Sequence, residues 1–113
     1  PRSQRSTARD RTGRSTSPEM RAPSASEIVL LARVLTRLAL EDRPFIASTI
    51  LAETDEAERH LRLTGRAHLT FGDGSLMSRC MQLCPPPEPF ADDCDFLASL
   101  ALAAKTVLIH SGA

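Results

Sequence analysis

Two glycines flank an aspartate in the stretch Phe71-Gly-Asp-Gly-Ser75, in a chain that has only five glycines. Consecutive backbone N–H groups in a glycine turn, followed by the start of a helix, can bind a phosphate or a carboxylate. Basic side chains on either side of the turn could add positive charge. The stretch and its neighbours therefore define a candidate interaction or anion-binding patch, made of Arg66, His68, Gly72, Asp73, Gly74, Ser75 and Arg79.

The same residues also fit a turn that serves only the fold. Asp73 lies in the middle of the stretch and would repel an anion. The spacing matches neither a P-loop nor a nucleophile elbow. Glycines that adopt positive φ, with Ser75 as the cap of the next helix, account for every residue in it. We prefer this interpretation, and the anion site stays an alternative.

A hydrolase would need a nucleophile, a base and an orienting carboxylate within hydrogen-bond reach of one another. The residue types are present as Ser75, His60 or His68, and Asp73. Nothing in their spacing forces them together, so we expect no catalytic site and no enzyme.

The three cysteines, Cys80, Cys84 and Cys94, could supply thiolates to a metal. Their spacing lacks the paired C-x₂-C arrangement of strong zinc sites. We expect Cys80 and Cys84 to share a helical face as small buried residues, and we expect no metal and no cofactor.

The apolar pattern predicts an all-α fold, a small bundle of about four helices. Leucine and alanine dominate the apolar residues, and both favour helices. Apolar residues recur at three- and four-residue steps, which is typical of amphipathic helices. We expect the helices at residues 25–40, 43–64, 75–83 and 93–109.

Capping residues support these bounds. Ser24 and Glu27 have the spacing of a capping box. Asp42 and Pro44 suit the start of the second helix, whose inner stripe should include Phe45, and Gly65 suits its end. An interruption near residues 54–55 stays open. The last helix is apolar nearly all round, so we expect it in the centre or at a subunit interface.

The chain divides into a tail and one domain. Residues 1–22 hold six arginines and two acidic residues, a balance of +4, and almost no side chain suited to a core. Such a segment is predicted to be disordered. Two interpretations stay open: a genuine basic tail, or residues 1–19 foreign to the native protein, with a start near Met20. Residues 23–113 are predicted to form a single helical domain.

Charge and hydropathy narrow the location and the partners. Residues 23–113 hold eight basic and twelve acidic residues, which argues against nucleic-acid binding by the domain itself. The N-terminus lacks the apolar segment of a signal peptide. The longest apolar run, residues 96–109, includes Lys105 and is too short to span a bilayer. We expect a cytoplasmic protein that does not enter membranes.

Residues 62–77, Arg-x-Thr-Gly-Arg-x-His followed by Gly-Asp-Gly-Ser-Leu-Met, carry a family resemblance. With the proline-rich segment and the apolar helix that follow, they resemble a small uncharacterised family of alphaproteobacteria. The likeness extends from about Ser26 to Ile109. It implies a short helical protein with no assigned function. The chain departs from the pattern at Leu69, where a proline is expected, and at its cysteines, where alanines are expected.

The sequence predicts a small helical module that binds another protein or itself, with its functional patch between Arg66 and Ser75. A long ordered loop with clustered polar residues is a common place for function. Two alternatives stay open. One is a nucleic-acid-associated regulator that binds weakly through the arginine-rich tail. The other is a small-anion or phosphoester enzyme at the Gly72–Ser75 turn.

Overall fold

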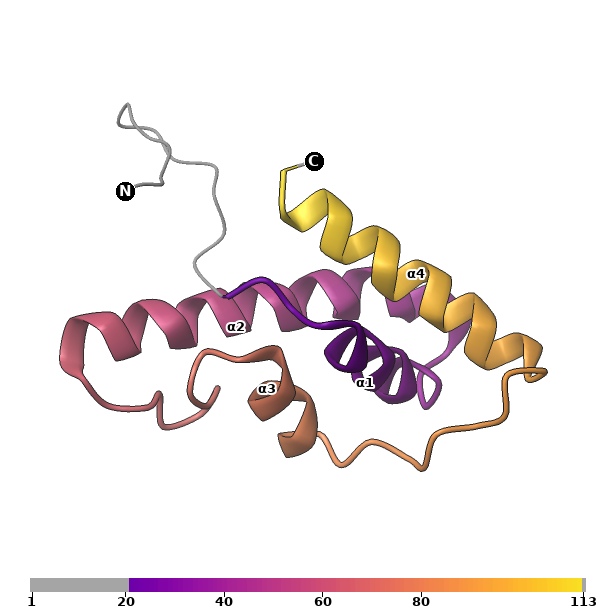
Figure 1. Ribbon diagram of the computed structural model, residues 1–113, viewed down its shortest axis with the longest axis horizontal. Helices are drawn as coiled ribbons and strands as arrows, with labels where there is room; N and C mark the ends of the chain where they lie inside the picture. The colour runs from indigo at the N-terminus through magenta and orange to yellow at the C-terminus, as the bar shows by residue number, and fades with distance from the viewer. Residues whose placement is uncertain (1–20, 113) are drawn as a thin grey trace.

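The computed structural model describes residues 21–112, which form a bundle of four α-helices and one short 3₁₀ helix (Figure 1). Within this range there is no β-strand, so the predicted all-α fold is confirmed. The predicted disorder of the tail concerns residues that lie almost entirely outside the described range. The elements are α1 (Ala25–Leu35), η1 (Leu40–Asp42), α2 (Arg43–Thr64), α3 (Leu76–Gln82) and α4 (Cys94–His110).

The core forms around α1, which contacts all three other α-helices. Five of the six residues from Leu30 to Leu35 of α1 are buried. This is possible because other helices pack on more than one side of α1. The opposing helices contribute apolar side chains to the same cluster. These are Ala47, Ile50 and Leu51 of α2, Leu76 and Cys80 of α3, and Phe96 and Ala103 of α4.

Local caps fix most helix ends where the sequence places them. Ser24 and Glu27 form the predicted capping box at the start of α1. Ser75 accepts from the backbone N–H of Ser78 and caps α3, and Asp93 caps α4 through the N–H of Phe96. Gly65 ends α2 with φ of 76°. In each case a side chain or a left-handed glycine satisfies backbone groups that the helix leaves unpaired.

The end of α1 differs from the prediction. The helix stops at Leu35 instead of continuing to residue 40, and the chain then turns into η1. The physical reason is Arg43, whose guanidinium binds two carbonyl oxygens of the turn, those of Leu38 at 3.0 Å and Thr36 at 3.4 Å. Asp42 occupies the N-cap position of α2 but makes no capping bond with its side chain.

Arg43 also ties the turn to α4. Its side chain is 6% exposed. The guanidinium donates to the Asp95 carboxylate at 2.9 and 3.3 Å and to the Ser99 hydroxyl at 2.9 Å. A buried charge is tolerated when its donors are all used, and Arg43 uses its donors on the start of α4 and the end of α1.

Two other expectations are wrong. Phe45, assigned to the inner stripe of α2, is 73% exposed, because the buried stripe follows Ala47, Ile50, Leu51 and Thr54. The last helix is not central, so the first of its two expected places is wrong and the second, a subunit interface, stays a prediction. It lies along α1 and α2 and buries little beyond Phe96, Ser99 and Ala103, which leaves its opposite side exposed (Figure 1). The possible break in α2 is also absent: Thr54 donates its hydroxyl to the Ile50 carbonyl inside a continuous helix.

The proline-rich segment after α3, from Pro85 to Pro89, has no regular secondary structure. It is held against α1 by Arg33, whose Nε donates to the Pro86 carbonyl at 2.7 Å. At the far end of α4, His110 Nε2 lies 2.7 Å from Asp55 Oδ2 of α2, an ion-pair distance without the alignment of a hydrogen bond. None of the helices in residues 21–112 has the length and hydropathy to cross a bilayer.

We expect Arg43→Ala to lower the free energy of unfolding by about 2–4 kcal/mol, because it leaves the Ser99 hydroxyl and turn carbonyls without their donor. Arg43→Lys should recover little, because an ammonium cannot reach the same acceptors at once. Urea unfolding measures both. Arg37→Ala, at an exposed position just after α1, is the control and should change the free energy by less than about 0.5 kcal/mol. Equal effects of the two alanine variants would contradict the assignment.

Candidate functional site

The candidate patch lies in the loop of residues 65–75, which joins α2 to α3 (Figure 1). The loop begins at the left-handed Gly65 and narrows at a β-bridge between His68 and Gly72. His68 N donates to the Gly72 carbonyl at 2.9 Å, and Gly72 N donates to the His68 carbonyl at 3.3 Å. These paired bonds close a small turn with Leu69 near its tip.

The side chain of His68 fastens the turn from inside. Its Nδ1 accepts from the backbone N–H groups of Thr70 and Phe71, both at 3.0 Å. Because Nδ1 is an acceptor, a neutral His68 carries its proton on Nε2. The imidazole therefore acts as a structural acceptor within its own loop.

A row of stacked groups joins the loop to both flanking helices. The His68 ring stacks on Phe71 with centroids 4.6 Å apart, and its other neighbour is the edge of His60 on α2 at 5.1 Å. The Arg79 guanidinium of α3 lies 5.1 Å from the Phe71 centroid, a cation–π distance. Arg79 also binds Glu53 of α2 at 2.9 Å.

The Gly-Asp-Gly-Ser turn satisfies its own donors. The Asp73 carboxylate accepts from the Ser75 N–H at 3.0 Å and from the Ser75 hydroxyl at 2.7 Å. The Ser75 oxygen in turn accepts from the Ser78 N–H at 3.0 Å. The Asp73 carboxylate thus uses the donors that a bound phosphate or carboxylate would need.

The electrostatics of Asp73 follow from these bonds. Hydrogen bonds from the Ser75 hydroxyl, then from the Ser75 N–H, hold the pKa of the carboxyl below its ordinary value of 3.8. Slight burial opposes the shift, and the charge of Arg21 adds to it. Asp73 is therefore ionised in the folded protein at neutral pH.

Tertiary contacts of the turn explain its second glycine. Gly74 has φ of 92°, and a Cβ there would lie 2.9 Å from the backbone Cα of Glu58 on α2. The start of α3 is also occupied, because Met77 N donates to Glu27 of α1 at 2.9 Å. Close packing on α2 and an internal carboxylate leave no room for an anion at this helix start.

The structure separates the predicted patch into two groups. His68, Gly72, Asp73, Gly74, Ser75 and Arg79 take part in contacts within the loop or with α2 and α3. Arg66 is exposed on the outside of the loop. There it lines a shallow hollow with His60, Thr64, Ala67 and Leu69. The arginines expected to share an anion are thus used differently, Arg79 in the scaffold and Arg66 on the surface.

The groups proposed for catalysis or metal binding do not assemble. Ser75 is hydrogen-bonded to a carboxylate, and His68 gives its Nδ1 to backbone amides, so these residues form no nucleophile–base pair. Cys80 is buried, and burial raises the pKa of its thiol to about 12. Cys84 lies beyond α3 and is exposed, which corrects its predicted burial. Residues 21–112 contain no cluster of His, Cys, Asp or Glu suited to a metal ion.

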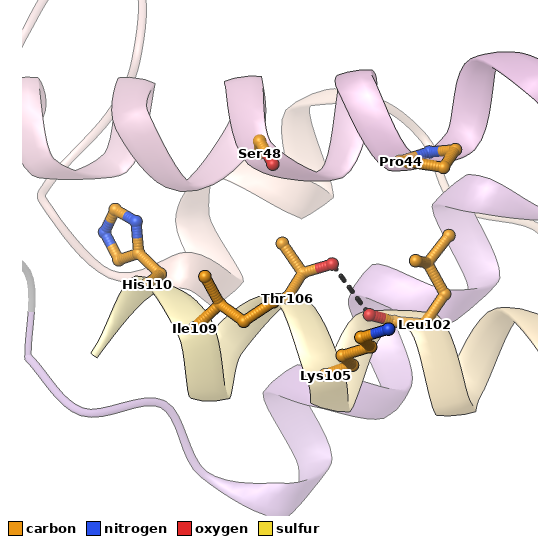
Figure 2. A pocket seen from close by; sticks show the side chains of 7 residues that line it. All are labelled: Pro44, Ser48, Leu102, Lys105, Thr106, Ile109 and His110. Atoms are coloured by element: carbon orange, nitrogen blue, oxygen red, sulfur yellow. Dashed lines mark hydrogen bonds between the residues drawn. The ribbon is translucent and has the colours of Figure 1, made fainter. Parts of the chain in front are cut away.

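Sequence reasoning missed two features. Leu69, named only as a departure from a family pattern, is 99% exposed at the tip of the loop. A groove of about 380 Å³ also runs between α2 and α4, and Figure 2 shows side chains of both helices facing it. Its lining is Pro44, Ser48, Leu102, Lys105, Thr106, Ile109 and His110. The Thr106 hydroxyl donates to the Leu102 carbonyl at 2.7 Å (Figure 2), and most of the exposed surface that lines the groove is apolar.

Replacing Gly74 should cost more stability than replacing Gly65. Gly65→Ala carries only the cost of a left-handed residue, about 1–2 kcal/mol, because nothing lies within 4 Å of the new Cβ. Gly74→Ala adds a clash with the Glu58 backbone, which we expect to raise the loss to about 2–4 kcal/mol. Chemical unfolding of both variants tests the difference. An equal loss would show that the close packing of the turn on α2 contributes nothing.

Asp73 should make stability fall at low pH. Because its folded pKa is below the unfolded value, it stabilises the fold at pH values above 3.8, and this is lost as pH falls through the folded pKa. Asp73→Asn keeps an acceptor oxygen but cannot titrate. Thermal unfolding between neutral pH and about pH 2 should therefore show a shallower acid dependence for Asp73→Asn than for wild type. Identical acid profiles would show that the carboxylate is not held by Ser75.

Comparison with known proteins gives a family and no activity. A family model described as a domain of unknown function, DUF7742, matches residues 21–107. No curated protein and no solved structure is detectably similar to the chain. The resemblance in the sequence predicted a family without an assigned function, and that part of the prediction is confirmed. Since the match covers most of the chain, with α1, α2, α3 and most of α4, the protein belongs to the DUF7742 family.

Proposed function

We propose that this protein is a small helical module that binds another protein through the 65–75 loop. The observation that supports the proposal is Leu69, which is 99% exposed although the backbone around it is fixed. When a partner covers a large apolar side chain that is fully exposed to water, the burial contributes favourable free energy to binding. Burial of one leucine is worth roughly 1.5–3 kcal/mol.

The rigidity of the loop makes Leu69 an effective contact. The bridge between His68 and Gly72 and the acceptor Nδ1 of His68 hold the backbone on both sides of it. The stacked row from His60 to Arg79 holds the loop on α2 and α3. A preorganised loop loses little conformational entropy on binding, so more of the burial energy remains as affinity.

The neighbourhood of Leu69 describes the kind of partner. The hollow beside it is open and shallow and contains Thr64, Arg66 and Ala67. An open hollow suits a protein surface better than a small molecule, which needs a concave, enclosing pocket. The complementary surface would offer an apolar pocket for Leu69 and acidic side chains for Arg66 at its rim.

The other two functions receive no comparable support. A small-anion enzyme at the Gly72–Ser75 turn conflicts with the carboxylate of Asp73, which already uses the Ser75 donors. The nucleic-acid alternative depends on the arginine-rich tail, most of which lies outside the described residues. Protein binding through the loop is therefore the function that the geometry supports best.

A photoreactive amino acid at position 69 of the full chain tests the proposal in cells. We expect a covalent adduct with one identifiable protein. The same amino acid at position 40 is the control, since Leu40 is an exposed leucine in the α1–α2 connection. No adduct at position 69, or the same adducts at both positions, would contradict the proposal.

Binding of the identified partner in purified form then measures the contribution of Leu69. Leu69→Asp should weaken the affinity by at least about tenfold, which corresponds to 1.4 kcal/mol, with an unchanged unfolding free energy. Leu40→Asp should bind as wild type does. Equal affinities of the two variants would show that the loop is not the contact.

A further inference from the structure

The outer side of α4 is an apolar surface that nothing in residues 21–112 covers. Leu97 and Leu108 are 42% and 56% exposed, and the alanines between them on this side are exposed as well. We call this surface the outer face of α4: Leu97, Ala98, Ala101, Ala104, Lys105 and Leu108. Its only charged member is Lys105, which lies at the border with the α2–α4 groove. The α4 ribbon lies at the edge of the bundle in Figure 1.

The other long helix shows what an exposed face of this protein normally carries. The solvent side of α2 bears two ion pairs along the helix, Arg59 with Glu56 and Arg62 with Glu58. A continuous apolar face on a helix usually marks an interaction surface. Because α4 already uses its opposite side on α1 and α2, a partner must come from outside the described fold.

We propose that this partner is a second copy of the chain, packed antiparallel along α4. The first argument is a pattern on the outer face itself. Leu97, Ala101, Ala104 and Leu108 are separated by four, three and four residues, so the order reads the same in both directions. These spacings keep all four side chains on one side of a helix. A twofold interface requires such self-complementarity, because each contact is made twice with the residues exchanged.

The antiparallel register follows from that pattern. A twofold axis midway between Ala101 and Ala104 places Leu97 opposite Leu108 of the second copy and Ala101 opposite Ala104. The small side chains at the centre allow the two helices to approach closely, and the leucines fill the space on both sides. In a parallel arrangement the small residues would still meet, but each residue would face its own equivalent.

Charge supports the antiparallel direction. Lys105 is the charged residue of the outer face. In the antiparallel register it lies opposite position 100 of the other copy, five residues along the helix from that copy's own Lys105. Parallel packing would set Lys105 against Lys105, and juxtaposed like charges oppose that arrangement.

The contact is distinct from the loop surface proposed above. Figure 1 shows the 65–75 loop well separated from α4. One helix pair buries less area than a standard stable interface, so we expect a reversible dimer and not an obligate one. A dimer of this kind leaves Leu69 accessible in both copies.

Sedimentation equilibrium of the full chain over a hundredfold concentration range tests self-association. We expect wild type to approach twice the monomer mass at the upper end, and its thermal midpoint to rise with concentration. Ala101→Glu should stay monomeric because it places two carboxylates near the twofold axis. Ala52→Glu, at an exposed alanine of α2, is the matched control and should dimerise as wild type does. A wild type that stays monomeric, or equal loss in both variants, would overturn the proposal.

Disulfide crosslinking tests the orientation separately. Leu97→Cys and Leu108→Cys are made in two chains that both carry Cys84→Ser and Cys94→Ser, which removes the exposed native thiols. Mixed chains should form a covalent dimer on oxidation, because residues 97 and 108 face each other. A dimer of either chain alone should not crosslink, because its two equivalent cysteines, one on each copy, would lie eleven residues, or about 16 Å, apart along the helix axis. Crosslinking of each chain alone indicates a parallel pair, and no crosslinking in the mixture excludes the antiparallel one; either result overturns the proposal.

Discussion

The arrangement of the bundle depends on the buried guanidinium of Arg43. This one side chain closes the turn after α1, stands at the first position of α2, and binds Asp95 and Ser99 on α4. The turn after α1, the start of α2 and the start of α4 therefore meet at a single charged group. A buried arginine is costly unless its donors are used, so any arrangement that separates these helices leaves the charge unpaired. Apolar burial drives the helices together, and Arg43 restricts the ways in which they can meet.

The 65–75 loop follows the same physical rule on a smaller scale. It is rich in polar groups, and the structure pairs most of them within the loop or with the adjoining helices. Asp73 takes the donors of Ser75, His68 takes the amides of its own turn, and Arg79 takes Glu53. Groups that looked chemically available in the sequence are thus committed to the fold. The loop exposes the side chains of Leu69 and Arg66. An exposed apolar side chain beside an arginine suits recognition of a protein surface better than catalysis.

Features set by neighbours in the chain could be predicted from the sequence, and features set by distant contacts could not. The caps at Ser24, Ser75 and Gly65 need only local residues, and they were placed correctly. The early end of α1 depends on Arg43 of the next helix, and this contact cannot be predicted from the apolar periodicity of α1. Phe45 is misplaced because it stands beside Ile46, and only packing decides which of two neighbouring apolar side chains is buried. In the loop, the turn was predictable, but the row linking Phe71 and Arg79 to Glu53 joins residues far apart in the sequence.

The misplacement of α4 has a physical meaning of its own. An apolar helix was expected at the centre because burial is the usual use of such a surface. In this bundle α1 occupies the centre, and residues 21–112 contain no further helix to cover the other side of α4. A second copy would supply the missing cover without adding sequence. Such a dimer would also display two rigid loops, and two linked contacts bind a partner that carries two matching sites more tightly than either loop alone. The outer face of α4 and the loop would then act together, the first by setting the spacing of the copies and the second by making the contact.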